Sequence, residues 1–303
     1  MPVERLGGEA ERAIDSVLAQ QTPFPFELIV VSAAALQLPD GSRVRNVVEA
    51  NRNPATRRNR AASVAAGEIF AFIDDDATAA PGWLATAVEY LDRHPDVLAL
   101  GGPDPAPDDS TTAELISDTL LATPLIGSGV AAHENRRGVF SIRSASDVAL
   151  VNLFVRKSAF TAFDESVGYI GEDTALIQQL MQTSSVIYHD GVRVYHRRRP
   201  FPGPYLKQRW RYRVKTGRML VRGSAAHRGN RKIHAFLIAG TLAILLAPVA
   251  IVPYVIVTLV LGTRVTRLRR RDRWLIPLAF ATHHLTYYFG IVWGMLRALT
   301  SKE

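Results

Sequence analysis

Three consecutive carboxylates, Asp74–Asp76, directly follow the apolar run Ile69–Ile73. Like charges this close together repel one another and raise each other's pKa. A divalent cation removes the conflict, because Mg²⁺ and Mn²⁺ prefer oxygen ligands and bind through one or two carboxylates together with substrate phosphates. The alternative is a solvated turn in which an aspartate caps a helix that opens at Pro81. The position after a buried strand favours the cation site.

A second acidic pair, Glu172-Asp173, follows Gly171 and begins an amphipathic helix that ends near Met181. Acidic side chains in a first turn suit the helix dipole, which is one explanation. The other is a carboxylate that points into a cleft and acts as a general base. His196 closes a predicted short strand. A single histidine is more often structural than a metal ligand, and both interpretations stay open for it.

Strands and helices alternate along the first 200 residues with short connections. This order predicts an α/β fold, a Rossmann-like and mostly parallel sheet with helices on both faces. Such sheets bind ligands at the carboxyl ends of their strands, and Asp74–Asp76 lie at such an end. The predicted strands are 26–31, 45–48, 69–73, 97–100, 148–155, 185–188 and 192–195. The predicted helices are 9–20, 55–66, 81–92 and 172–181, and 103–146 is predicted to be loops around short elements.

Charge is divided unevenly along the 303 residues, which hold 36 Lys and Arg, 28 Asp and Glu, and no cysteine. The lack of cysteine excludes a disulfide framework, a thiolate metal site and a cysteine nucleophile. Residues 191–303 carry 22 basic and 2 acidic side chains, a net +20, which leaves −12 for residues 1–190. An acidic body on a basic, apolar tail is not the pattern of a uniformly soluble protein.

Two hydrophobic segments, 235–262 and 274–296, predict a membrane domain over 233–303, because about 20 apolar residues suffice to cross a bilayer. The topology stays open. Both flanks of the first segment are basic, which a single crossing cannot reconcile with positive charge on the cytoplasmic side. Pro248 and Pro253 make a re-entrant hairpin as plausible as one tilted helix. No signal peptide is visible near Met1, so we expect the acidic body on the cytoplasmic side of the inner membrane.

The basic stretch 201–232 predicts an amphipathic interfacial segment with a helix at Pro204–Arg222. Nucleic acid is one possible partner for such a run. Its place directly before a hydrophobic segment instead favours anionic lipid headgroups, so we expect membrane lipids and no nucleic acid. Arg197–Arg199 either contact phosphate or belong to a plain positive anchor.

Several motifs taken together resemble a known family. They are RRNRAA, IDDD, NLFVRKSAF…FDE…GEDTAL, VYHRRR and HHLTYYFG, and the resemblance covers roughly residues 9–298. The chain is similar to membrane-associated family 2 glycosyltransferases of the succinoglycan type and related enzymes of cell-surface polysaccharide synthesis. The resemblance implies a GT-A fold over residues 1–200, followed by interfacial and transmembrane helices. It also implies a nucleotide-diphosphate sugar as donor, Mg²⁺ or Mn²⁺ as cofactor, and inversion at the anomeric carbon.

The resemblance also assigns roles by position. Asp76 would bind the metal that bridges the diphosphate, and His196 matches a histidine that completes the metal site in many GT-A enzymes. Asp173 would be the base that takes the proton of the acceptor hydroxyl, and Glu172 would help to hold the acceptor.

Three further residues would contact the nucleotide sugar, with Asp74 nearer the ribose. They are Arg58, Asp74 and Asp75.

The chain departs from the family pattern at three places. Only Met1–Gly8 stand where the family has a strand before the first helix, Ser32-Ala33 replace an acidic pair, and Leu206 stands where processive relatives have glutamine. We therefore expect non-processive transfer of one sugar to a lipid-linked or saccharide acceptor at the membrane. The alternative is a catalytically degenerate scaffold with the same fold in a polysaccharide assembly complex. The oligomeric state is not predicted.

Overall fold

The computed structural model describes residues 1–39, 41, 43–123, 137–167, 171–222, 239–242 and 247–300. The chain divides into two compact units. The first contains Met1–Asp108 and Val130–Arg197, and the second contains Asp109–Gly129 and Arg198–Glu303. The first unit thus ends three residues before the boundary predicted at 200. Asp109–Gly129, which the sequence placed in the first domain, belongs to the second unit.

The first unit is built on two sheets and a short strand pair. β1 (Leu28–Ser32) and β2 (Val44–Val48) pair in parallel. The five-stranded sheet has the order β3 (Ile69–Phe72), β7 (Leu153–Arg156), β5 (Ala99–Gly101), β8 (Val186–His189), β6 (Val139–Ser141). β7 is antiparallel to both β3 and β5, and β8 is parallel to β5. β3, β5 and β8 therefore run in one direction, while β7 and β6 run in the other.

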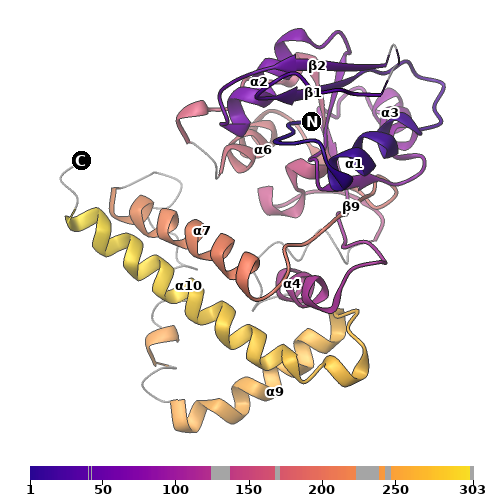
Figure 1. Ribbon diagram of the computed structural model, residues 1–303. Helices are drawn as coiled ribbons and strands as arrows, with labels where there is room; N and C mark the ends of the chain where they lie inside the picture. The colour runs from indigo at the N-terminus through magenta and orange to yellow at the C-terminus, as the bar shows by residue number, and fades with distance from the viewer. Residues whose placement is uncertain are drawn as a thin grey trace. The chain divides into compact units, whose positions relative to one another are not determined.

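A hydrophobic core lies on each face of the five-stranded sheet, because successive side chains of a strand point to opposite faces. On β7, Phe154 belongs to one core and its neighbours Leu153 and Val155 belong to the other. The first core includes residues of α1 (Gly8–Leu18) and α3 (Trp83–Arg93), and the second includes residues of α2 (Pro54–Val64) and α6 (Glu172–Thr183). Figure 1 shows these helix pairs on opposite sides of the first unit. The α/β fold with helices on both faces is confirmed.

Local sequence signals account for the helix boundaries. Asn53 caps α2 with its side chain, and Pro54 opens the helix, where its missing N–H costs nothing. α4 (Thr112–Ala122) lies in the stretch predicted to be loops, so that prediction was wrong for these residues. Its start was readable, since Thr111 and Glu114 form a capping box in which each side chain bonds the other's backbone N–H.

The second unit contains α4, α7 (Gly203–Arg222), α9 (Ala247–Val265) and α10 (Leu275–Thr300). α7 confirms the helix predicted at Pro204–Arg222. α7 and α10 lie side by side (Figure 1), and their backbones touch at glycine. A Cβ added to Gly217 would overlap the carbonyl oxygen of Ile291, and one added to Gly294 would overlap that of Val214. The Tyr205 hydroxyl, 3.0 Å from Nδ1 of His283, joins the same two helices.

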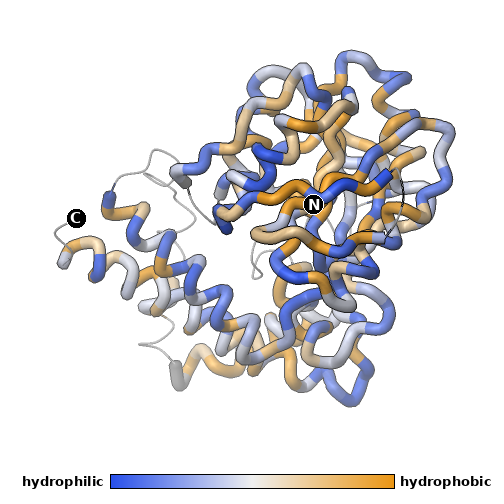
Figure 2. The backbone as a smooth tube through the Cα atoms, turned by 45° about the horizontal axis from the view of Figure 1, so that its top comes forward, coloured by the Kyte–Doolittle hydropathy of each residue, from blue (hydrophilic) through white to orange (hydrophobic). Residues whose placement is uncertain are grey.

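No helix in the described part of the chain is both long enough and apolar enough to cross a membrane. The predicted crossings at 235–262 and 274–296 are therefore not supported, and residues 235–238 and 243–246 of the first lie outside the described ranges. α9 nevertheless exposes many apolar side chains. They include Val249, Ile251, Val252 and Ile256. α10 adds Trp274, Leu278, Phe289 and Trp293. Figure 2 colours the backbone by residue hydropathy, with hydrophobic residues in orange.

Candidate active site

Strand direction brings several polar side chains to one edge of the five-stranded sheet. Asp74–Asp76 follow β3, and Asp104 follows β5, whose direction is the same. Asn152 immediately precedes β7, which runs the opposite way, so it lies at the same edge. This is the edge at which α/β sheets bind their ligands.

The short strand β9 (Val194–His196) aligns two of these segments. On one side it pairs with β4 (Ala77–Ala79), and His196 stands opposite Ala77, the residue after Asp76. On its other side, the His196 N–H donates to the carbonyl of Pro105 at 2.9 Å, and the Val194 N–H donates to Pro103 at 3.1 Å. The backbone pairing therefore places the side chain of His196 between those of Asp76 and Asp104.

The three side chains are in contact. His196 Nε2 lies 3.2 Å from Asp76 Oδ1, and His196 Nδ1 lies 3.3 Å from Asp104 Oδ2. The Asp104 side chain is only 4% exposed, whereas that of Asp76 is 35% exposed. The two residues predicted to bind metal are thus brought together at a partly open position.

The chemistry of Asp76 and His196 fits a divalent cation. Within the described residues no group of three or more histidine, cysteine or acidic side chains forms a complete ligand set. A complete set is not needed, because Mg²⁺ usually takes only one or two protein ligands and completes its shell with water and substrate phosphates. The carboxylate oxygen of Asp76 and Nε2 of His196 would supply the protein's share.

Arg58 joins the two acidic clusters. Its Nη2 lies 2.9 Å from Asp74 Oδ1, and its Nη1 lies 3.1 Å from Glu172 Oε1. The guanidinium and Glu172 are buried, while Asp74 is one-third exposed. Asp74–Asp76 and Glu172-Asp173, almost 100 residues apart in the sequence, therefore meet through one side chain of α2.

Burial perturbs the acids of both clusters. Burial raises the pKa of Glu172, and the neighbouring Asp173 raises it further, while Arg58 opposes the shift. Burial, with repulsion from Asp76 and Asp74, raises the pKa of Asp75 to about 6. Such shifts are frequent where a protein gathers like charges for binding or catalysis.

Asp173 lies in the first turn of α6 and is half-buried. Its Oδ1 accepts hydrogen bonds from the backbone N–H and the hydroxyl of Thr174. Gly171 precedes the helix with φ of 97°, a left-handed conformation that favours glycine. The base role of Asp173 stays a prediction, as does the contact of Arg58 and Asp75 with a nucleotide.

Asp104 and Asn152 lie at this edge of the sheet, but the sequence did not predict a role for either of them. Asn152 is fully buried, and its amide donates to the carbonyls of Pro103 and Val192 and accepts from the Trp83 indole. The available signal for Asp104 was the preceding pair of glycines. A Cβ on Gly102 would overlap the carbonyl oxygen of Val192, so glycine is required where the segment after β5 approaches the one before β9.

The departures from the family pattern have structural counterparts. Met1–Val3 lie alongside β1, because the Val3 N–H donates to Val31 O and the Val31 N–H donates to Met1 O. Ser32 is buried, its hydroxyl donates to Ala34 O, and it accepts from the Asn46 amide.

Arg198, a candidate for phosphate contact, instead forms a buried ion pair with Asp118 inside the second unit.

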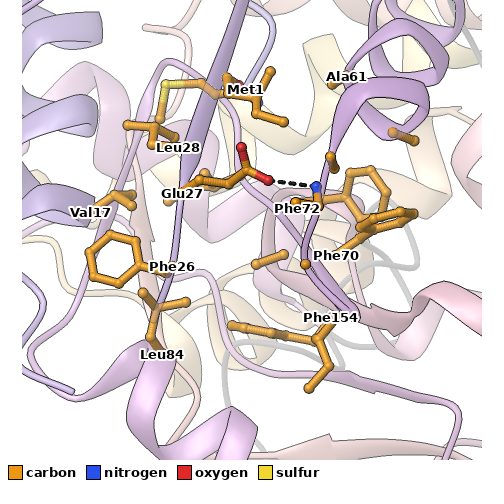
Figure 3. Close-up of a pocket in the computed structure, with 18 of the residues that line it drawn as sticks. Met1, Val17, Phe26, Glu27, Leu28, Ala61, Phe70, Phe72, Leu84 and Phe154 are labelled. Atoms are coloured by element: carbon orange, nitrogen blue, oxygen red, sulfur yellow. Dashed lines mark hydrogen bonds between the residues drawn. The ribbon is translucent and has the colours of Figure 1, made fainter. Parts of the chain in front are cut away.

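An apolar cavity of about 480 Å³ in the first unit is lined by Arg58 and otherwise by residues outside the acidic site. Residues of β1, β3 and α2 line it, among them Leu28, Phe70 and Phe72, which point into it (Figure 3). A hydrogen bond from the Ala66 N–H to the Glu27 carboxylate lies at its border. Asp76, Glu172 and His196 are not among the lining residues.

Slightly less than half of the chain matches the model of a known family. Residues 7–145 match the model of "Glycosyl transferase family 2". The resemblance of the sequence motifs to this family is confirmed over these residues.

Two characterised proteins are similar to the chain. One is a glucosyl-dolichyl phosphate glucuronosyltransferase of Haloferax volcanii, 36% identical over 98 residues, which are 29% of this chain and 31% of that protein. The match therefore spans about a third of this relative. The other is the structure of a mannosyltransferase from Pyrobaculum calidifontis in complex with GDP-Man and Mn²⁺. It has a TM-score of 0.54 and 18% identity over 100% of this chain and 86% of that chain, so the likeness shows the GT-A-like fold alone.

Proposed function

We propose that the chain transfers one sugar from a nucleotide-diphosphate sugar to a lipid-linked or saccharide acceptor, with inversion at the anomeric carbon. The observation that carries the proposal is the meeting of the two acidic clusters at Arg58. Sugar transfer needs one carboxylate to hold the cation at the donor and another to take the proton of the acceptor hydroxyl. The two carboxylates must lie close to each other, and this arrangement provides both. The match of residues 7–145 to the model of "Glycosyl transferase family 2" supports the reaction class.

The cation and the donor would lie on the side of Asp76 and His196. A divalent cation bound there would neutralise charge on the departing nucleoside diphosphate. Asp74 and Asp75, on the same turn as Asp76, would face the nucleotide. The structural neighbour holds GDP-Man and Mn²⁺, which is consistent with a donor and a metal of this kind.

The acceptor would approach from the side of Glu172 and Asp173. The acceptor oxygen forms the new bond to the anomeric carbon, the bond from that carbon to the diphosphate breaks, and the hydroxyl proton passes to the Asp173 carboxylate. Asp173 is more exposed than Glu172, which suits a group that meets the substrate. Glu172, held by Arg58, would keep the first turn of α6 in position and help to bind the acceptor.

The experiment is sugar transfer measured as release of nucleoside diphosphate from a panel of sugar donors, with lipid extract and Mn²⁺. Asp76→Ala and Asp173→Asn are each expected to lower turnover by at least about 100-fold, the usual contribution of a general base or of a cation ligand. Asp15→Asn, an exposed acid on α1, is the matched control and is expected to retain full turnover. Turnover at the control level in both site variants would refute the assignment. A wild type that binds donor without turning it over would favour the scaffold alternative.

We propose further that the second unit holds the chain at the cytoplasmic face of the inner membrane. The exposed apolar side chains of α9 and α10 would enter the lipid, and the six arginines of residues 264–273 would attract anionic headgroups. A lipid-linked acceptor suits such a location, and the Haloferax relative is named for an acceptor on dolichyl phosphate.

The test is flotation with vesicles of phosphatidylethanolamine and phosphatidylglycerol. Val252→Glu combined with Ile256→Glu is expected to reduce the bound fraction, because both side chains are exposed on α9. Val48→Glu, an equally exposed valine of the first unit, is the control. Equal flotation of the double variant and the control would exclude α9 as the contact.

A further inference from the structure

His196 stands between two carboxylates of very different accessibility. Its Nδ1 faces Asp104, whose side chain is 4% exposed, and its Nε2 faces the more open Asp76. A neutral imidazole carries its proton on one nitrogen and a lone pair on the other. A buried carboxylate at Nδ1 favours a proton on that nitrogen. The lone pair of Nε2 then faces the Asp76 oxygen 3.2 Å away, a repulsive contact that a divalent cation between the two atoms would relieve.

The backbone fixes the Asp104 side of this arrangement. The segment Pro103–Pro105 is hydrogen-bonded to β9 on both sides of Asp104, through the N–H groups of Val194 and His196. The amide of Asn152 donates to the carbonyls of Pro103 and Val192, which holds the two segments together. Asp104 therefore has little freedom to turn away from the imidazole.

We propose that Asp104 is a positioning residue that sets the tautomer and orientation of His196, so that Nε2 can join Asp76 in binding a divalent cation. Histidine ligands of metals usually donate their second ring N–H to a carboxylate or carbonyl, which fixes the ring and makes the ligating nitrogen more basic. The inference rests on the proposed function, because it gives the pair Asp76 and His196 a cation to bind. The competing arrangement is an imidazolium, protonated at both nitrogens and paired with both carboxylates.

The tautomer can be measured without any activity. In protein labelled with ¹⁵N at histidine, with Mg²⁺ and nucleoside diphosphate present, the ring signals of His196, assigned from a His196→Gln variant, are expected to show a protonated Nδ1 and an unprotonated Nε2 at pH 8. Asp104→Ala is expected to lose this preference. Asp104→Asn keeps an acceptor oxygen of the same shape and is expected to restore most of it. Two protonated ring nitrogens at pH 8 in the wild type would overturn the proposal.

The second measurement is Mn²⁺ affinity, followed by the electron paramagnetic resonance signal of free Mn²⁺ in the presence of nucleoside diphosphate. Removing an outer partner of a histidine ligand usually costs about 10–100-fold in metal affinity. We expect a loss of this size for Asp104→Ala and a smaller one for Asp104→Asn. Asp96→Asn, an exposed acid just before β5, is the control. Thermal unfolding of each variant separates loss of the fold from loss of the site.

The two proposals fail in different ways. If His196→Gln binds Mn²⁺ as the wild type does, the cation role of His196 in the proposed function is wrong, and the positioning proposal falls with it. If His196→Gln weakens binding while both Asp104 variants keep wild-type affinity and ring signals, Asp104 is not a positioning residue, and the proposed function stands.

Discussion

Replacement of Arg58 tests whether one buried guanidinium holds the two acidic clusters together. Arg58→Met keeps the aliphatic path of the side chain and its packing near the Phe163 ring, but it removes the cation from Asp74 and Glu172. Breaking a buried ion pair by removing one partner costs about 3–5 kcal/mol. We expect the lower end, about 3 kcal/mol, because Asp74 is one-third exposed and water can replace its partner.

At about 2–4 °C per kcal/mol for a domain of this size, the first unit should unfold roughly 6–12 °C below the wild type. Trp83 is buried in the first unit and can report its unfolding alone once Trp210, Trp274 and Trp293 are changed to phenylalanine. Arg60→Met, an exposed arginine on the same helix, is the matched control and should unfold like the parent.

The loss of stability in Arg58→Met should depend on pH. Burial already raises the pKa of Glu172, and loss of Arg58 removes an interaction that lowers it. The folded variant then keeps its proton to a higher pH than the unfolded chain, so its stability falls as pH rises above the unfolded pKa of about 4.5. The deficit of Arg58→Met should therefore be smaller at pH 5 than at pH 8.

A second substitution isolates the cause. Glu172→Gln in the Arg58→Met background removes the unpaired charge and should recover about 1–2 kcal/mol at pH 8. If Arg58→Met is as stable as Arg60→Met, or if its deficit neither depends on pH nor responds to Glu172→Gln, the two clusters do not depend on the guanidinium.

Two further predictions concern the backbone around the site. Gly102→Ala should prevent the close approach to Val192 and destabilise the first unit strongly, measured as loss of soluble folded protein. Gly7→Ala, with open space and extended backbone, should cost at most about 1 kcal/mol, the effect of alanine at the N-cap of α1. Asn152→Ala leaves three buried polar groups without their partner and should cost about 3 kcal/mol of unfolding free energy in urea, with a weaker Mn²⁺ affinity because β9 loses its anchor. A stability within about 0.5 kcal/mol of the wild type would contradict this account of Asn152.

Local patterns in the sequence were sufficient for most elements of the first unit. Apolar runs of strand length predicted β1, β3 and β5, and helical spacing predicted α1, α2, α3 and α6, because these signals depend only on neighbouring residues. The position of Asp74–Asp76 after β3 followed from the same reasoning. α4 was missed although its capping box was present, because its surroundings are rich in proline and aspartate.

Only the tertiary structure decided which of these residues meet. Nothing near Asp104 in the sequence indicates that it contacts His196, 92 residues further on, since the contact depends on the pairing of β9 with the segment after β5. The contact predicted between Arg58 and a nucleotide stays a prediction, and only the structure shows that Arg58 also lies between Asp74 and Glu172. The sequence by itself indicated the resemblance to family 2 glycosyltransferases, most elements of the first unit and the two acidic clusters. Long-range strand pairing and the burial of charge, which no local pattern encodes, decided how those carboxylates are held.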